Sequence, residues 1–452
     1  MSIFKPCDIR GVYGRDLTER QACALGRAAG GKSGKGTALV AGDVRLSTPA
    51  LKEALVRGLV DAGCRVTDAG ILTTPAFYFA VRSTRAAVGV MVTASHNPPE
   101  YNGFKLVFHG RPVSQAELAG LERSIAAGPP GAGQGDCRPD GTWLERYCDY
   151  LVGRFPPGEF KVVLDCGNGA CSRPAPQVFR ALGYRVVELF CVPDGRFPNR
   201  PPNPALKENL AALSRRVVEE GAVLGIAFDG DGDRVAFVDE TGRPLEDDRI
   251  LALLARHQLG RQRGVVVYDS KCSLVVAEEV ARLGGTPLMA RSGHAFVGRA
   301  FREHDALLAG ELSGHFFWRD PGFDDGIFSS LVLAGLLHES GISLSMLDRS
   351  LPCYHTTPDI RLPFTGDGPE LVEDAARQLG GLSLSRLDGV RVELADAWGM
   401  VRPSVTEPLV TLRFEGKSRE SLSRVVALVL GALPDEIGRP AREALAASAG
   451  PE

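Results

Sequence analysis

The chain lacks an excess of either charge sign and lacks a long uninterrupted apolar run. Its 452 residues include 52 Lys and Arg against 55 Asp and Glu, which gives a net charge of −3 at pH 7. Nucleic-acid-binding proteins usually carry a basic excess, so this balance predicts no nucleic-acid partner. Residues 1–10 contain no apolar signal-peptide segment, and the most apolar stretch, residues 329–347, is interrupted by His338 and Glu339. We therefore expect a cytoplasmic protein that does not enter a membrane.

The cysteines show no regular spacing. Ten are scattered along the chain without the intervals of a disulfide framework or a zinc site, so we expect reduced thiols with mostly structural roles. Apolar residues make up 44% and charged residues 24% of the chain, values that exclude a largely disordered or fibrous protein. The length corresponds to about three domains of roughly 150 residues, or to four smaller ones.

An internal repeat organises most of the chain. Each copy contains an apolar β-branched run, an Asp-containing loop, a helix-period stretch, a glycine and a second strand-like run, and the copies occupy residues 38–67, 161–188 and 265–289. Glycine after a helix favours a left-handed C-terminal cap. Apolar strands that alternate with helices favour a parallel sheet with both faces covered. The repeat thus predicts three similar mixed α/β domains.

The pattern changes after Leu351. Short strand-like runs at 390–394 and 409–414 alternate with helical stretches at 369–379 and 418–433, but they do not follow the order of the repeat. This mixture predicts a smaller α+β C-terminal domain. The expected domains are residues 1–141, 142–243, 244–354 and 355–452.

Two local signals help to place the end of the first domain. Gly and Pro are concentrated between residues 128 and 141, which predicts a loop. Before it, Ser114 with Glu117 ahead of Leu118 predicts a capping box at the start of a helix. The boundary is therefore expected near this loop, after residue 141.

The first of four polar loops carries a serine on a tight turn. The run TASHNP at residues 93–98 follows an apolar strand-like segment, and Pro98 prevents the strand from continuing. An exposed Ser95 hydroxyl beside His96 suits a nucleophile, although no G-x-S-x-G elbow surrounds it. An ordinary Ser/Asn turn explains the same residues, so this loop alone leaves both interpretations open.

The second loop, DGDGDR, contains three aspartates at alternate positions: Asp229, Asp231 and Asp233. Like charges repel unless a cation lies among them, and the intervening glycines allow the side chains to converge. The pattern favours a divalent metal over a solvated acidic turn, and three carboxylates favour Mg²⁺ with positions left for phosphate. An EF-hand calcium loop would also use Glu240, but Arg234 stands at its obligatory glycine and the flanks have the pattern of strands.

The third loop, GELSGH at residues 310–315, follows another apolar run. Glu311 and Ser313 suit the hydroxyls of a sugar, and His315 can move a proton near neutral pH. A capping turn before the next helix explains the same residues about as well.

The fourth loop, RPSVTEP at residues 402–408, lies between two strand-like runs of the last domain. Arg402, Ser404 and Thr406 offer hydrogen-bond donors to a phosphate without requiring a basic protein. A simple turn of the chain is the alternative interpretation.

In this order and at these intervals, the four loops resemble the α-D-phosphohexomutase superfamily, and the resemblance covers the whole chain. It extends to five shorter runs: Asp8-Ile9-Arg10-Gly11, Asn102-Gly103-Phe104-Lys105, residues 194–199, Lys271-Cys272 and Gly293-His294. The form GELSGH followed by FDDGI is most similar to the phosphomannomutase/phosphoglucomutase group, whereas the glucosamine branch usually has Glu-Gln-Ser-Gly-His at the first of these runs.

The resemblance implies four domains around a central cleft and a defined reaction. A phosphoryl group would pass between the 1- and 6-positions of mannose or glucose phosphate through a phosphoserine and a hexose 1,6-bisphosphate. Ser95 would be that phosphoserine and would bind Mg²⁺ together with Asp229, Asp231 and Asp233. Glucose 1,6-bisphosphate would act as activator, and the partners would be hexose phosphates, with the protein a monomer or a weak homo-oligomer.

Further roles follow from the resemblance and from the charge of a transferring phosphoryl group. Arg10, Lys105 and Arg234 would stabilise that charge, and Lys105 or His315 would transfer the proton. Glu311 and Ser313 would hold ring hydroxyls. The phosphate that does not react would be held by Lys271, His294, Arg402, Ser404 and Thr406.

Three residues depart from the family pattern, and three other functions stay open. Cys7 stands where an aromatic residue is common, Val405 replaces a polar or small residue, and Arg200 stands where His is frequent. A phosphoglucosamine mutase is the second enzymatic interpretation. A sugar-phosphate-binding protein without turnover and a calcium-binding structural protein are the alternatives from other classes.

Overall fold

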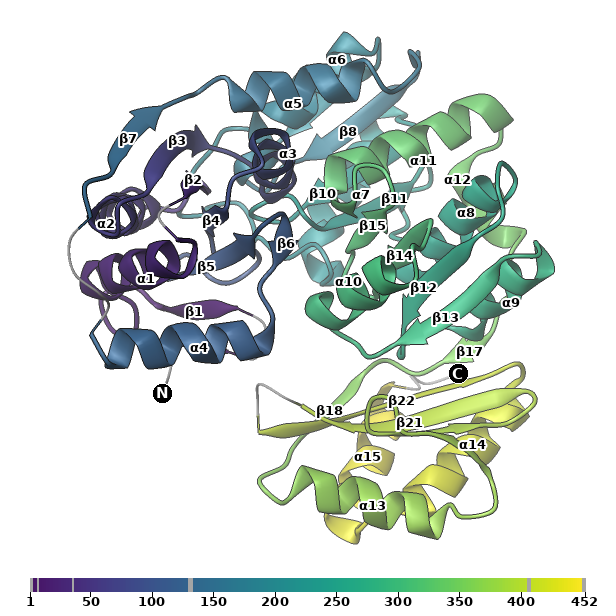
Figure 1. The fold of residues 1–452 in the computed structure, drawn as a ribbon. Helices are drawn as coiled ribbons and strands as arrows, with labels where there is room; N and C mark the ends of the chain where they lie inside the picture. Colours follow the sequence, from purple (N-terminus) through teal and green to yellow (C-terminus); the bar gives the residue numbers. More distant parts are fainter. Residues whose placement is uncertain (1–2, 6–7, 35, 129–132, 405–407, 449–452) are drawn as a thin grey trace.

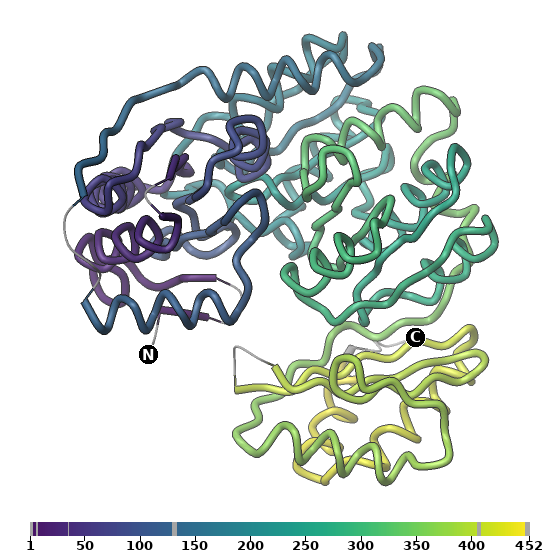
Figure 2. The backbone as a smooth tube through the Cα atoms, viewed as in Figure 1, coloured from purple at the N-terminus to yellow at the C-terminus, as the bar shows by residue number. Residues whose placement is uncertain are grey.

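A computed structural model describes residues 3–5, 8–34, 36–128, 133–404 and 408–448 of the chain. The described strands form four sheets, one for each copy of the repeat and one for the C-terminal part (Figure 1). Figure 2 traces the chain through these parts in order, from the purple N-terminal domain to the yellow C-terminal one. The predicted architecture of three mixed α/β domains and a smaller α+β domain is confirmed. No helix among the described residues has the length and apolar character needed to cross a bilayer.

The first domain is built on a seven-stranded sheet with the order β1-β5-β4-β2-β3-β7, and β6 pairs with β5. Strands β4, β2, β3 and β7 run parallel, whereas β5 pairs antiparallel with both of its neighbours, β4 and β1, at one edge. The expectation of a parallel sheet is therefore wrong at this edge, because the chain turns back directly after β4. The elements are β1 (Ile9–Val12), α1 (Glu19–Lys32), β2 (Thr37–Gly42), α2 (Thr48–Asp61), β3 (Arg65–Ile71), α3 (Thr74–Thr84), β4 (Val88–Val92), β5 (Tyr101–Phe108), β6 (Arg111–Pro112), α4 (Gln115–Ala126) and β7 (Asp136–Pro139).

Strand β7 corrects the prediction of a loop at residues 128–141. It pairs in parallel with β3, where Asp136 lies opposite Arg65. The sequence pattern does not reveal it because the strand is short and mostly exposed at a sheet edge, without a buried apolar side. The predicted capping box is confirmed, since the Ser114 hydroxyl accepts from the Glu117 amide while the Glu117 carboxylate accepts from the Ser114 amide.

The second and third domains repeat this plan on smaller sheets, with the orders β11-β10-β8-β9 and β13-β12-β14-β15-β16. In each, parallel strands are followed by an antiparallel hairpin, β10–β11 or β14–β15. The glycines after the repeat helices, Gly63, Gly183 and Gly284, have φ values of 88°, 90° and 73°, as expected for left-handed caps.

The elements of the second domain are α5 (Trp143–Val152), β8 (Lys161–Asp165), η1 (Ala170–Ser172), α6 (Pro174–Ala181), β9 (Arg185–Leu189), η2 (Lys207–Leu210), α7 (Ala211–Glu220), β10 (Leu224–Phe228) and β11 (Val235–Asp239). Those of the third are α8 (Asp247–Leu259), β12 (Val265–Asp269), α9 (Leu274–Arg282), β13 (Thr286–Ala290), α10 (His294–Glu303), β14 (Leu308–Gly310), β15 (Phe316–Trp318), β16 (Phe323–Asp324), α11 (Gly326–Ser340) and α12 (Leu344–Arg349).

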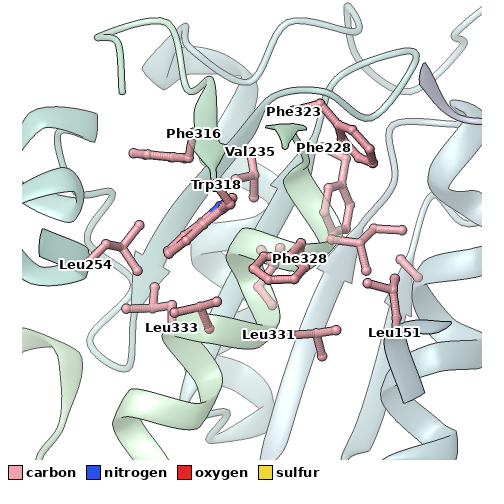
Figure 3. Packing of buried hydrophobic residues seen from close by; sticks show 14 of the residues in the cluster. Leu151, Phe228, Val235, Leu254, Phe316, Trp318, Phe323, Phe328, Leu331 and Leu333 are labelled. Atoms are coloured by element: carbon pink, nitrogen blue, oxygen red, sulfur yellow. The ribbon is translucent and has the colours of Figure 1, made fainter. Parts of the chain in front are cut away.

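One apolar cluster links the first three domains. It contains Phe77 of α3, Phe228 of β10, Trp318 of β15 and Phe328 of α11, among others. The rings of Trp318 and Phe328 have centroids 5.4 Å apart. Figure 3 shows both rings among the buried side chains of this cluster, which also includes Phe228. Because a shared core of this kind resists relative motion of its parts, the loops of these three domains are held in fixed positions.

The fourth domain has an apolar cluster of its own and meets the third domain through polar groups. The Leu274 amide donates to Glu415 Oε1 at 2.8 Å, and the Arg391 guanidinium donates to the Ser270 carbonyl. Helix α15 was not predicted, because Pro440 interrupts its helical pattern. The elements are β17 (His355–Thr356), β18 (Ile360–Pro363), α13 (Gly368–Gln378), β19 (Ser383–Ser385), β20 (Val390–Glu393), β21 (Ala397–Pro403), β22 (Leu409–Gly416), α14 (Arg419–Gly431) and α15 (Asp435–Ser448).

Candidate active site

Ser95 lies on the turn between β4 and β5. Its φ is 50°, a left-handed conformation that residues other than glycine adopt mainly at strained or functional positions. Its Oγ donates to Asp229 Oδ2 at 2.7 Å, and its amide donates to Thr93 Oγ1 at 2.9 Å. Ser95 is only 2% exposed, so the prediction of an exposed hydroxyl is wrong. The run that begins at Asp229 in the second domain covers it.

A buried arginine that the sequence analysis missed holds this turn in place. The Arg45 guanidinium donates to four carbonyl oxygens of the turn, those of Ser95 (2.8 Å), Asn97 (2.6 Å), Pro98 (2.6 Å) and Tyr101 (3.0 Å). Its Nε donates to Asp43 Oδ2 at 3.1 Å, which balances its charge. The turn is thus fixed by its backbone, and the side chain of Ser95 remains available.

Three buried carboxylates face Ser95 from the hairpin of β10 and β11. Asp229, Asp231 and Asp233 are at most 1% exposed, and each offers an oxygen within 4.8 Å of the others. Asp231 Oδ1 and Asp233 Oδ1 are buried without a hydrogen-bond partner among the described residues. Hard oxygen ligands suit Mg²⁺, and the unpartnered buried oxygens fit a bound cation and not a solvated turn. The flanking strands exclude the EF-hand, which needs flanking helices.

The environment acts on these charges in different ways. Burial, reinforced by Asp231 and Asp233, raises the pKa of Asp229 well above its usual value. Burial also disfavours the charged form of Asp233, but Lys105 outweighs it and lowers the pKa of Asp233 to about 2. Lys105 Nζ lies 2.7 Å from Asp231 Oδ2 and also contacts the carboxylate of Asp233. Burial lowers the pKa of Lys105, but these two carboxylates outweigh it and raise that pKa well above its usual value.

His315 and His294 share one carboxylate, that of Asp324, which the sequence analysis did not single out as a site residue. His315 Nδ1 lies 2.7 Å and His294 Nε2 lies 3.0 Å from Asp324 Oδ2. Burial raises the pKa of Asp324, but the two histidines outweigh it and hold that pKa well below its usual range. Since an ionised carboxylate only accepts hydrogen bonds, His315 carries a proton on Nδ1. Its Nε2 then accepts from Arg234 Nε at 2.9 Å.

These groups open into one cavity of about 410 Å³ between the first and third domains. Arg10 reaches it from β1, where its Nη1 donates to Asn97 Oδ1 at 2.6 Å and its Nη2 pairs with Asp8 at 2.5 Å. The predicted site residues that line the cavity are Arg10, Ser95, Lys105, Asp233, Arg234, His294 and His315. Residues from three domains are thus brought together.

Glu311 and Ser313 lie on the same loop as His315 but do not line this cavity. The Ser313 hydroxyl donates to Glu311 Oε2 at 3.1 Å, while Glu311 Oε1 is buried without a hydrogen-bond partner among the described residues. Burial raises the pKa of Glu311. A buried acceptor without a partner is available to the hydroxyl of a ligand.

Lys271 and Arg402 lie at the junction of the third and fourth domains, apart from the residues that line the cavity. Lys271 Nζ pairs with Asp359 Oδ2 at 2.8 Å, and Arg402 Nε pairs with Asp388 at 2.9 Å. The Ser404 amide donates to the Leu409 carbonyl at 2.8 Å. Three residues singled out from the sequence, Thr406, Val405 and Cys7, are outside the described residues.

Arg200, a departure from the family pattern, has a structural explanation. Its Nε donates to Asp165 Oδ2 at 2.8 Å, and its Nη2 donates to the Phe228 carbonyl at 2.8 Å. Phe228 immediately precedes Asp229, so Arg200 links strand β8 to the start of the aspartate run, residues 229–233.

Family models match the chain along almost its whole length. They are the models of phosphoglucomutase/phosphomannomutase alpha/beta/alpha domains I, II and III and of the C-terminal domain, which match residues 1–130, 145–242, 246–354 and 360–432. A phosphomannomutase/phosphoglucomutase of Pseudomonas putida is 41% identical over 434 residues, which are 94% of this chain and 94% of that protein.

Solved structures show the same similarity. A phosphoglucomutase/phosphomannomutase family protein of Burkholderia thailandensis superimposes with a TM-score of 0.90 at 37% identity, covering 97% of this chain and 98% of that one. An N-acetylphosphoglucosamine mutase of Aspergillus fumigatus, solved in complex with glucose 1,6-bisphosphate, shares the fold with a TM-score of 0.57 at 14% identity, covering 98% of this chain and 95% of that one. Fold and site define the α-D-phosphohexomutase class. Within it, the chain belongs to the phosphoglucomutase/phosphomannomutase family.

Proposed function

We propose that the protein is a phosphomannomutase/phosphoglucomutase that reversibly moves a phosphoryl group between the 1- and 6-positions of mannose or glucose phosphate. The observation that carries the proposal is the contact between Ser95 and Asp229 at the edge of a cavity lined with cationic side chains. A dianionic phosphate needs such cations around it, and a loose phosphoryl-transfer transition state needs positioning and charge stabilisation more than covalent chemistry.

Ser95 is the residue that carries the phosphoryl group in this proposal. Mg²⁺ would be held by Asp229, Asp231 and Asp233 together with the Ser95 site, and it would supply positive charge to the transferring group. One carboxylate oxygen of Asp231 and one of Asp233 have no hydrogen-bond partner in the part of the chain that the structure describes, which supports this assignment.

Three cationic side chains stabilise the phosphoryl group from the chain itself. Arg10, Lys105 and Arg234 all line the cavity that contains Ser95. Lys105 is held between two carboxylates, so its ammonium group is fixed in place and charged. Arg10 is fixed through Asn97 on the same turn as Ser95, which couples its position to that of the phosphoryl group.

Proton transfer is assigned to His315, with Lys105 as the second candidate. His315 Nε2 faces Arg234 and accepts a hydrogen bond in the structure, so it has a lone pair that can take a proton. Asp324 acts as a positioning residue, because its contact with Nδ1 fixes the tautomer and the orientation of the ring.

The remaining residues are assigned to binding of the sugar ring and of the phosphate that does not react. Glu311 and Ser313 would hold ring hydroxyls, and Glu311 Oε1, which has no hydrogen-bond partner among the described residues, provides an acceptor. The phosphate that does not react would be held by Lys271, His294, Arg402, Ser404 and Thr406. A bound phosphate would then compete with the carboxylates of Asp359 and Asp388 for Lys271 and Arg402.

Glucose 1,6-bisphosphate is the proposed activator, since it would return a phosphoryl group to Ser95 after the intermediate escapes. The glucosamine alternative is not favoured, because the curated relatives at about 40% identity are named phosphomannomutase/phosphoglucomutase. The proposed domains are residues 1–141, 142–243, 244–354 and 355–452. A monomer or weak homo-oligomer in the cytoplasm stays a prediction from the sequence.

A coupled assay tests this function. The protein is given Mg²⁺, a trace of glucose 1,6-bisphosphate and, in parallel, glucose 1-phosphate, mannose 1-phosphate or glucosamine 1-phosphate. We expect comparable kcat/KM on glucose and mannose phosphates and none with Ser95→Ala. Turnover of the glucosamine substrate alone would replace the proposed substrate, and no turnover of any sugar would refute the enzymatic assignment.

A further inference from the structure

Two cysteines of the second domain lie in contact at the ends of neighbouring strands. Cys166 directly follows β8, and Cys191 follows β9, its parallel neighbour. The Cys166 amide donates to the Leu189 carbonyl at 3.1 Å, and Phe190 takes a left-handed φ of 55°, which accompanies the return of Cys191 toward Cys166. The two Sγ atoms are 3.2 Å apart.

This distance is about 1.1 Å longer than a disulfide bond, so the two sulfur atoms and the strand ends that carry them must move closer together for the bond to form. Cys166 is 1% exposed, whereas Cys191 is half-buried and borders solvent. Burial raises the pKa of the Cys166 thiol, so Cys191 is the thiol that meets an oxidant first.

We infer that Cys166 and Cys191 form a reversible oxidative modification site that responds to hydrogen peroxide. The Cys191 thiolate attacks one peroxide oxygen, the O–O bond breaks, and the products are a sulfenic acid and hydroxide. The Cys166 sulfur then displaces the sulfenic oxygen, which leaves as water with the thiol proton, and the S–S bond forms. Two thiols lose two electrons in total, and the peroxide is reduced to water. A dithiol reverses the reaction by exchange.

The modification site is connected to the aspartate run. The loop after Cys166 touches it directly, because the Ala170 amide donates to the Gly230 carbonyl at 2.9 Å. The same loop is tied to the Cys191 segment, since the Asn168 amide donates to the Phe190 carbonyl at 2.8 Å. Drawing the two sulfurs together therefore shifts the backbone against which Gly230 is packed.

We expect the disulfide to weaken cation binding at Asp229, Asp231 and Asp233, roughly tenfold, the effect of about 1.4 kcal/mol. This consequence rests on the proposed function, because it assigns Mg²⁺ to these residues. The disulfide itself does not depend on that function. Peptide mapping and calorimetric binding of Mg²⁺ therefore separate the two statements.

The test treats the full-length protein with hydrogen peroxide, blocks free thiols under denaturing conditions and digests with trypsin. We expect the peptide of residues 162–180 to be linked to that of residues 186–196, and the link to disappear with dithiothreitol. Cys191→Ser and Cys166→Ala should abolish it. Cys171→Ser is the matched control, because Cys171 is a buried cysteine in the first peptide and its replacement should leave the link intact.

Three results would overturn the inference. Absence of the linked peptide, or a link that uses Cys171, would refute the modification site. A linked protein that binds Mg²⁺ with unchanged Kd, measured beside reduced protein and oxidised Cys191→Ser, would refute its connection to the aspartate run. If Mg²⁺ does not bind to the reduced protein, the metal assignment of the proposed function fails while the disulfide stands.

Discussion

Replacement of Asp324 by asparagine should slow turnover. The carboxylate of Asp324 accepts hydrogen bonds from His315 Nδ1 at 2.7 Å and from His294 Nε2 at 3.0 Å. An asparagine amide keeps the shape but removes the charge, and a hydrogen bond to a charged group contributes about 1.5–3 kcal/mol. The charged carboxylate stabilises the His315 ring most when the ring carries the transferred proton. Loss of this stabilisation should therefore lower kcat about 10- to 150-fold.

The assay measures kcat and KM of Asp324→Asn in the coupled reaction, beside Asp325→Asn as a matched control. Asp325 is equally buried, but it caps α11 through the Phe328 amide and accepts from the Tyr147 hydroxyl at 2.7 Å. It is given no role in the chemistry. We expect kcat to fall only for Asp324→Asn, and we expect a rise in KM of this variant alone, because His294, which is assigned to the non-reacting phosphate, also loses its contact with the carboxylate. An unchanged kcat for this variant, or an equal loss in both, would refute the positioning role.

Three further changes test other parts of the structure. Arg45→Met leaves four carbonyls of the Ser95 turn and the buried Asp43 carboxylate without this partner. We therefore expect a loss of about 3–5 kcal/mol in the free energy of unfolding and a lower Tm. An unchanged Tm would contradict this prediction. Burial raises the pKa of Asp248 to about 6, so its contribution to stability is present below about pH 4 and lost as the pH rises to 6, by about 3 kcal/mol. Asp248→Asn should therefore raise Tm near pH 7 but not near pH 4, and a constant difference would count against it. Glu311→Ala should lower kcat/KM about tenfold or more because both acceptor oxygens are lost, and wild-type kinetics would exclude Glu311 from binding sugar.

The parts of the site that could be predicted are those whose reason lies within a few residues. Asp229, Asp231 and Asp233 repel one another when they converge, so their spacing alone indicates a cation. The turn that carries Ser95 is marked by Pro98 directly after it. Both runs are positioned as their local sequence predicts, at the ends of buried strands.

Arg45 and Asp324 were missed because their partners are distant in sequence. Arg45 donates hydrogen bonds to carbonyl oxygens of residues more than fifty positions further along the chain. Because every residue has a backbone carbonyl, the sequence does not show which carbonyls an arginine will bind. Asp324 belongs to the run that supported the family resemblance, yet its link to His294 joins β16 to the start of α10. Only the folded third domain brings these residues together.

The fold was predictable where the apolar residues follow a regular period. It was not predictable for polar segments at the edges of the sheets, which have no such period. The repeat strands and their glycine caps follow from local pattern, whereas β7 is a short exposed edge strand and α15 contains Pro440. The antiparallel edges of the sheets follow from hairpins whose direction depends on tertiary packing. The burial of Ser95 is likewise a consequence of contact between two domains.

The central claim is that Ser95 carries the phosphoryl group, and one measurement tests it most directly. Purified protein is mixed with Mg²⁺ and glucose 1,6-bisphosphate, quenched, and analysed by intact mass and peptide mapping. We expect the mass of one phosphoryl group on the peptide that contains Ser95, its loss when excess glucose 6-phosphate is added, and its absence from Ser95→Ala. Phosphorylation at another residue, or turnover of hexose phosphate by Ser95→Ala at the wild-type rate, would contradict the account.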